Sequence, residues 1–310
     1  MISPDVQRQI DIAARQLELG NPRGAIEPLR YALSLEPDLA VAHAILALAL
    51  LRLERIHAAR HEAHTAVALD PEDALAHRVL GLVLLAHREL SDAGQHLRRS
   101  IDLAPDDPEG YRALASLHVA EGRRAEEREA LEKALALDPE HPVTLAELGM
   151  HHLAVGEIDE AERCADEVLA ESPEQHAALV LKGQVLLRRG KTADAREHAL
   201  WALRQDPEDP QALHLLAGVK ARESAFLGLW WRFNVWMCEL GEARAMAVLL
   251  GSYVVYQLAR LALIDLGFPS LASAAQIAWL ALCVYTWVGP ARFRAAVERE
   301  LAQVRLRDDF

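Results

Sequence analysis

The chain has 310 residues and a formal net charge of −13, with 46 acidic and 33 basic residues. Residues 1–220 hold 38 of the acidic and 24 of the basic residues, so the acidic excess lies in the N-terminal part. Surfaces that bind nucleic acids are basic, and this charge balance therefore excludes a nucleic acid as the expected partner. A protein partner fits the composition better.

The N-terminal sequence MISPDVQRQIDIA lacks the basic-then-apolar pattern of a secretory signal peptide. The three cysteines are widely spaced and odd in number, which predicts neither a disulfide framework nor a CxxC metal site. Both features favour a reducing compartment. We expect the N-terminal part to stay in the cytoplasm.

A period of 34 residues runs through the first two-thirds of the chain. Each period ends at a proline that follows a Leu- and Ala-rich stretch with helical spacing, and these prolines are Pro37, Pro71, Pro105, Pro139, Pro173 and Pro207. Proline ends a helix because it lacks an N–H donor and its ring clashes with the preceding turn. Each period therefore predicts a unit of two short helices.

Small residues recur at fixed places within the period. In the first helix of each unit they are Ala13, Ala47, Gly81, Ala115, Gly149 and Gly183. The turn between the helices has Gly20, Gly122, Gly156 and Gly190, and Glu54 and Arg88 take the equivalent positions in the second and third units. In the second helix, an alanine recurs at Ala25, Ala59, Ala93, Ala161 and Ala195, with Glu127 as the exception.

With this pattern the sequence resembles the tetratricopeptide repeat family. The resemblance implies an all-α solenoid of six helical-hairpin repeats and a capping helix within residues 1–222. The repeats span 6–39, 40–73, 74–107, 108–141, 142–175 and 176–209, and the capping helix spans 210–222. The bulky aromatic residues of the family are mostly replaced here, for instance by His43 and His77.

The resemblance further implies a concave groove lined by the first helices. Its groove-facing positions correspond to a mainly apolar set: Ala44, Leu48, Leu51, Arg78, Leu82, Leu85, Arg112, Val119, Met150, Leu153, Val180, Gln184 and Leu187. The family's clamp for a chain-terminal carboxylate needs Lys or Arg with Asn, and this set has neither Asn nor Lys. We therefore expect the groove to bind a helical or apolar segment of a partner protein. In the alternative, several of these leucines are buried between adjacent repeats.

Three histidines of the second repeat share one helix face, because His57, His61 and His64 follow i, i+4, i+7 spacing. A His pair at i, i+4 can chelate a transition metal, which makes these residues a weak candidate metal site. No carboxylate or cysteine completes the site, so we expect neither a metal nor a cofactor. No nucleotide-binding or catalytic motif is present, and we expect no enzymatic activity.

The C-terminal third is apolar. Residues 245–264 and 270–288 are runs of 20 and 19 residues that contain one charge, Arg260, and the loop DLGFP joins them. About 20 apolar residues span a bilayer as a helix, so residues 243–290 predict a transmembrane helical hairpin. In the alternative, the hairpin is buried in a protein core.

The flanks of the two runs predict an orientation. Arg232 and Arg244 precede the first run, and Arg292 and Arg294 follow the second, whereas the loop has no basic residue. Basic flanks remain cytoplasmic. The expected location is therefore the inner (cytoplasmic) membrane with the repeats facing the cytosol.

An aromatic segment, FLGLWWRFNVWM, lies between the repeats and the first run. Tryptophan favours the headgroup region of a bilayer, so residues 223–242 predict an interfacial helix that contacts the membrane through Phe226, Trp230, Trp231, Phe233 and Trp236. The alternative is a collar packed on the last repeat or on a membrane-protein partner. Residues 291–310 predict an amphipathic helix and a tail.

Two classes of function fit the sequence. The first is a non-enzymatic, membrane-anchored adaptor that binds protein partners through its groove and a bilayer or membrane proteins through residues 226–290. The second is a structural subunit of a stable membrane-protein complex, or a soluble self-assembling scaffold and thus a homo-oligomer. The excess of Arg (29) over Lys (4) is typical of GC-rich bacterial genomes.

Overall fold

The computed structural model describes residues 3–223, 242–266, 268, 270–277 and 279–280. Within these residues the regular structure is helical and no β-strand occurs, which confirms the predicted all-α class. The chain divides into two units, Met1–Glu157 (unit 1) and Ile158–Phe310 (unit 2).

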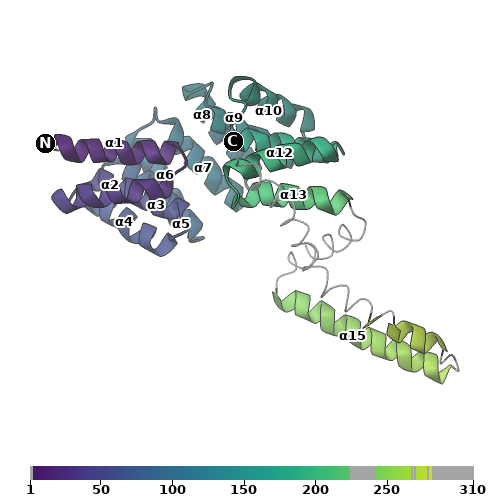
Figure 1. Cartoon of the computed structure of the whole chain (residues 1–310). Helices are drawn as coiled ribbons and strands as arrows, with labels where there is room; N and C mark the ends of the chain where they lie inside the picture. The colour runs from purple at the N-terminus through teal and green to yellow at the C-terminus, as the bar shows by residue number, and fades with distance from the viewer. Residues whose placement is uncertain (1–2, 224–241, 267, 269, 278, 281–310) are drawn as a thin grey trace, which may run out of the picture. The chain divides into compact units, whose positions relative to one another are not determined.

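Unit 1 is built from successive antiparallel helix pairs (Figure 1). Its helices are α1 Pro4–Glu18, α2 Pro22–Leu35, α3 Ala40–Arg52, α4 Ile56–Leu69, α5 Ala74–Ala86, α6 Leu90–Leu103, α7 Pro108–Glu121, α8 Arg124–Leu137 and α9 Pro142–Val155. The first helices α1, α3, α5 and α7 each pack against their own second helix, α3, α5 and α7 also contact one another in order, and α9 packs against α8. This is the helical-hairpin repeat fold that the 34-residue period predicts.

The repeating prolines set the ends of the second helices. In unit 1 these helices end two residues before their prolines, at Leu35, Leu69, Leu103 and Leu137. The aspartates that follow start the next helices, because Asp73 accepts a hydrogen bond from the Leu75 N–H at 2.9 Å and Asp107 accepts one from the Glu109 N–H at 3.0 Å. Such caps satisfy N–H groups that have no partner within the helix.

The turns inside the repeats require a left-handed residue. Gly20 and Gly122 have φ values of 71° and 74°, which glycine adopts without a steric penalty. Glu54 and Arg88 adopt the same conformation, with φ values of 58° and 64°. The turn geometry is therefore maintained in the two repeats that lack the glycine.

Close packing explains the rows of small residues. The repeated alanines of the second helices, Ala25, Ala59 and Ala93, are completely buried. A Cβ atom on Gly81 of α5 would lie 2.6 Å from Cδ2 of Leu97 on α6. Helices approach closely at these positions because larger side chains are absent there.

Unit 2 continues the repeat pattern with α10 Ile158–Glu171, α11 His176–Arg188, α12 Thr192–Gln205 and α13 Pro210–Glu223, and it also contains α15 Glu242–Asp265. Helix α13 occupies the residues of the predicted capping helix and packs against α12 and α11. The Arg222 guanidinium on α13 donates a hydrogen bond to the carbonyl oxygen of Leu187 at the end of α11.

The predicted membrane anchor is not supported, and the predicted inner-membrane location is wrong. In the described part of the chain, every helix is either too short or too polar to cross a membrane. Helix α15 has 24 residues, but Ser252, Gln257 and Arg260 interrupt its apolar sequence. In the second predicted run, 270–288, residues 270–277 are helical, while 278 and 281–288 are outside the described residues.

Other sequence predictions concern residues outside the described part of the chain. These are the aromatic contacts proposed for Phe226, Trp230, Trp231, Phe233 and Trp236, and the amphipathic helix proposed within residues 291–310.

Candidate functional site

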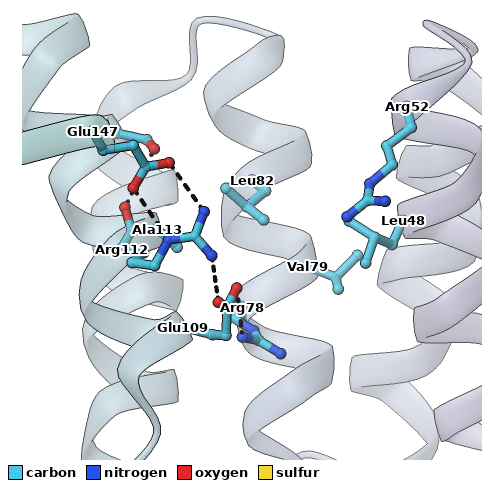
Figure 2. Close-up of a pocket in the computed structure, with 10 residues that line it drawn as sticks. Leu48, Arg52, Arg78, Val79, Leu82, Glu109, Arg112, Ala113 and Glu147 are labelled. Atoms are coloured by element: carbon cyan, nitrogen blue, oxygen red, sulfur yellow. Dashed lines mark hydrogen bonds and ion pairs between the residues drawn. The ribbon is translucent and has the colours of Figure 1, made fainter. Parts of the chain in front are cut away.

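A pocket lies on the face that the first helices of unit 1 share. Its cavity of about 250 Å³ is lined by Leu48 and Arg52 of α3, Arg78, Val79 and Leu82 of α5, Glu109, Arg112, Ala113 and Ser116 of α7, and Glu147 of α9. Figure 2 shows Arg52 and Leu48 on one side of the pocket and Arg112 with Glu147 on the opposite side. We call this site the unit 1 pocket.

The lining follows the repeat register. Leu48, Leu82 and Ser116 are each 34 residues apart, and so are Val79, Ala113 and Glu147. Equivalent positions of consecutive first helices therefore meet along one surface, and the pocket results from the stacking of repeats.

Arg112 is held by two carboxylates. Its Nε and Nη2 donate to the two oxygens of Glu147 at 3.1 and 3.0 Å, and its Nη1 contacts Glu109 (Figure 2). Burial opposes the charged form of Arg112, but the hydrogen bonds and charges of Glu147 and Glu109 outweigh it and raise the pKa of the guanidinium. This two-pronged contact fixes the orientation of both side chains.

Arg78 has a similar, looser environment. Its Nη1 lies 3.4 Å from Oδ2 of Asp107 and 3.4 Å from Oε2 of Glu109. Both contacts have ion-pair distances, but neither has the geometry of a hydrogen bond, and the Nη1 atom is buried. Glu109 thus links Arg78 to Arg112 across adjacent helices.

Arg52 differs from both. Its Nη1 donates to the carbonyl oxygen of Leu17 at 2.5 Å, and among the described residues no carboxylate lies within 4 Å of it. Arg52 is an exposed residue, yet partial burial of its guanidinium lowers its pKa; the charge of Glu109 opposes this and that of Arg112 adds to it. Arg52 is therefore a cation at the pocket that forms no ion pair with a carboxylate of the described chain.

The structure brings four of the predicted groove residues into this pocket, namely Leu48, Arg78, Leu82 and Arg112. Leu51, Leu85 and Met150 are half-buried and Val119 is exposed, outside the pocket lining. Ala44 and Leu153 are buried in the interior of unit 1 and offer little surface to a partner. In unit 2, Val180 is buried, and Gln184 and Leu187 are half-buried.

Sequence reasoning missed the pocket residues Arg52, Val79, Glu109, Ala113, Ser116 and Glu147. The repeat register contained part of the signal, because Val79 and Ala113 directly follow Arg78 and Arg112. Arg52 lies one helical turn beyond Leu48, on the same face of α3. The charged members make the pocket far more polar than the apolar groove that was expected.

The three candidate metal ligands of α4, His57, His61 and His64, are exposed. The described residues contain no group of three or more His, Cys, Asp or Glu side chains that could hold a metal ion. One close contact instead joins histidines of two different helices. Nδ1 of His77 on α5 lies 2.9 Å from Nδ1 of His96 on α6.

Comparison with known families gives two matches. One family model described as tetratricopeptide repeat matches residues 45–108, 147–210 and 182–222. A second model with the same description matches residues 108–141. Together they cover more than half of the chain, within α3 to α13. No curated protein sequence matches the chain.

Solved structures share the fold. A chain of the APC/C hetero-tetramer Cut9–Hcn1 matches with a TM-score of 0.57 and 18% identity, over 69% of this chain and 43% of that chain. A tetratricopeptide repeat protein from Parabacteroides merdae matches with a TM-score of 0.57 and 16% identity, over 69% and 84%. PilW, a type IV pilus biogenesis factor, matches with a TM-score of 0.52 and 16% identity, over 69% and 99%.

Proposed function

The chain belongs to the tetratricopeptide repeat family, and on that premise we propose that unit 1 is a non-enzymatic protein-binding scaffold. Its pocket receives a helical segment of a partner protein. The observation that supports this proposal is the unit 1 pocket itself, in which the half-buried Leu48 and Leu82 lie beside a network of fixed charges.

The chemistry of the pocket suits an amphipathic segment. Leu48, Val79 and Leu82 offer apolar contact, and burying apolar surface contributes roughly 25 cal/mol per Å² to binding before the cost of ordering the segment. The ion pairs of Arg112 are already formed without a ligand, so their side chains lose little freedom on binding. Fixed charges beside these apolar side chains contribute more to the choice of partner than to the strength of binding.

The similarity to PilW, a pilus biogenesis factor, and to a chain of the Cut9–Hcn1 hetero-tetramer is compatible with a role in assembling protein complexes. Their identities of 16% and 18% identify the fold alone. The partner of this chain is therefore best sought by an unbiased selection of peptides.

The test is a selection of 16-residue random peptides on the full chain, followed by fluorescence polarisation with the enriched peptides. The Leu48→Asp plus Leu82→Asp variant places two charges in the pocket, and we expect at least tenfold weaker binding. Leu35→Asp plus Leu137→Asp is the matched control, because both leucines are exposed and outside the pocket. Circular dichroism checks that each variant is folded. Equal binding by both variants would contradict the proposal.

A second candidate function is self-assembly, which exposed side chains on α15 favour. Val255 is 66% exposed and Leu258 is 62% exposed, and exposed apolar patches often mark contact surfaces. We expect sedimentation velocity to detect a concentration-dependent oligomer that the Val255→Ser plus Leu258→Ser variant loses. A wild-type chain that stays monomeric at all concentrations would exclude this function.

A further inference from the structure

The charges of the unit 1 pocket are unevenly compensated. Arg112 is paired with Glu147 and Glu109, and Arg78 lies near Asp107 and Glu109. Arg52 is the one arginine of the pocket lining for which the described residues provide no carboxylate. A cation that forms no ion pair is stabilised by an anion that comes into contact with it.

The known contact of Arg52 uses only one of its five N–H donors. That contact, from Nη1 to the carbonyl oxygen of Leu17, ties the end of α1 to α3. The same contact recurs in unit 2, where Arg222 donates to the carbonyl oxygen of Leu187. Arg222 follows Arg52, and Leu187 follows Leu17, by 170 residues, which is five repeats. The contact with Leu17 is thus a feature of the repeat, but Arg52 also lines a pocket.

The surroundings of Arg52 define what kind of anion fits. Leu48 on the same helix and Val79 and Leu82 on the next supply apolar surface beside the guanidinium. The pocket lining contains neither Lys nor Asn. A planar guanidinium binds a carboxylate through two parallel hydrogen bonds. The apolar side chains beside it favour a ligand in which a carboxylate stands next to an apolar group.

We propose that Arg52 is the specificity-determining residue of the pocket and binds a carboxylate of the partner segment, while an adjacent apolar side chain of that segment packs on Leu48, Val79 and Leu82. This inference rests on the proposed function, because it names the chemistry of the segment that the pocket receives. The preferred ligand is an amphipathic segment with Asp or Glu next to Leu, Ile or Val.

The experiment uses the full chain and the 16-residue peptides selected on it. We expect these peptides to be enriched in Asp or Glu beside an apolar residue. Arg52→Gln should weaken the binding of the leading peptide about 10- to 100-fold, the usual range for a hydrogen bond between charged groups. Replacing the acidic residue of the peptide by Gln or Asn should have a similar effect, and combining both changes should add little.

Arg222→Gln is the matched control. It removes the same charge and the equivalent hydrogen bond to a helix-end carbonyl, but it lies in unit 2 and outside the pocket lining. Binding by this variant should equal that of wild type. Arg52→Lys keeps the positive charge but cannot donate two parallel hydrogen bonds to one carboxylate. This variant should therefore bind the peptide with intermediate affinity. Melting temperatures show whether Arg52→Gln remains folded.

Peptides with a free and with an amidated C-terminus distinguish the two sources of a carboxylate. If amidation of the leading peptide removes the dependence on Arg52, the carboxylate is terminal; if not, it belongs to a side chain. Peptides that bind through Leu48 and Leu82 without any acidic preference, or without loss on Arg52→Gln, would overturn the inference and leave the proposed function intact. Peptides whose binding is unchanged in the Leu48→Asp plus Leu82→Asp variant would refute the proposed function itself.

Discussion

Oε2 of Glu127 on α8 lies 3.2 Å from Nδ1 of His151 on α9, and both side chains are only 5% exposed. Each is a buried polar residue in a row of the repeat whose other buried members are apolar. The equivalents of Glu127 are buried alanines, and the equivalents of His151 in neighbouring repeats are the buried Val83, Leu117 and Val185. The two groups thus lie at ion-pair distance across the interface of adjacent repeats, and Oε2 of Glu127 also accepts a hydrogen bond from Nη1 of Arg124 at 2.8 Å.

Replacing Glu127 by Ala should therefore destabilise the protein even though it restores the repeat pattern. His151 would stay buried without its carboxylate, and the expected loss is about 1–3 kcal/mol in the free energy of unfolding. The Glu127→Ala plus His151→Val variant should recover most of this loss because both polar groups are gone. Urea denaturation of the two single variants and the double variant measures the coupling. Glu126→Ala, which removes an exposed carboxylate next to it, is the control, and additive effects would contradict the pairing.

Gly81→Ala should also destabilise unit 1. The new Cβ would lie 2.6 Å from Cδ2 and Cγ of the fully buried Leu97, so the two helices must separate at a cost of about 1–3 kcal/mol. Gly251→Ala on α15 meets no heavy atom within 4 Å and should be neutral or slightly stabilising. Thermal denaturation compares the two variants. A Gly81→Ala protein as stable as wild type would mean that the helices are less tightly packed than described.

Arg88→Gly should stabilise the third repeat. Arg88 has a φ of 64°, and a side chain in this left-handed conformation costs about 1 kcal/mol that glycine avoids. Its equivalent in the next repeat, Gly122, has a φ of 74°, and Gly122→Ala should destabilise by a similar amount. Chemical denaturation tests both substitutions. The same sign of effect for the two variants would rule out the turn conformation as the cause.

Stability should fall in mildly acidic solution because of His96. Burial lowers its pKa below the ordinary value of 6.5; the charges of His77 and His64 add to this effect and Asp92 opposes it. The unfolded chain therefore takes up a proton at a higher pH than the folded chain, and stability decreases as the pH falls below about 6.5. The contact between Nδ1 of His77 and Nδ1 of His96 also cannot persist when both rings are fully protonated.

The free energy of unfolding, measured from pH 7.5 to pH 5, tests this dependence. His96→Gln should flatten the profile, whereas His61→Gln, at an exposed position of α4, should leave it unchanged. Identical profiles for wild type and His96→Gln would show that another group is responsible.

The membrane prediction shows how a composition-based argument can mislead. A run of about 20 residues with one charge satisfies a length criterion, and residues 245–264 satisfy it. The polar residues Ser252, Gln257 and Arg260 nevertheless recur within α15, and Gln257 donates a hydrogen bond to the hydroxyl oxygen of Tyr253. Length and the count of charges are therefore weaker criteria than the polarity of the complete helix.

The sequence by itself determined the repeat fold of this protein, because the features that specify it are local. Proline ends each second helix, Asp73 and Asp107 cap the helices that follow them, and small residues at a 34-residue spacing allow neighbours to approach. Only the tertiary structure decided which charged side chains meet. Arg112 and Glu147 are 35 residues apart, and Glu127 and His151 are 24 apart. Their contacts depend on the stacking of adjacent repeats. For the same reason, only the stacked helices place Arg52 beside the apolar Leu48, Val79 and Leu82 with no ion pair to a carboxylate of the described chain.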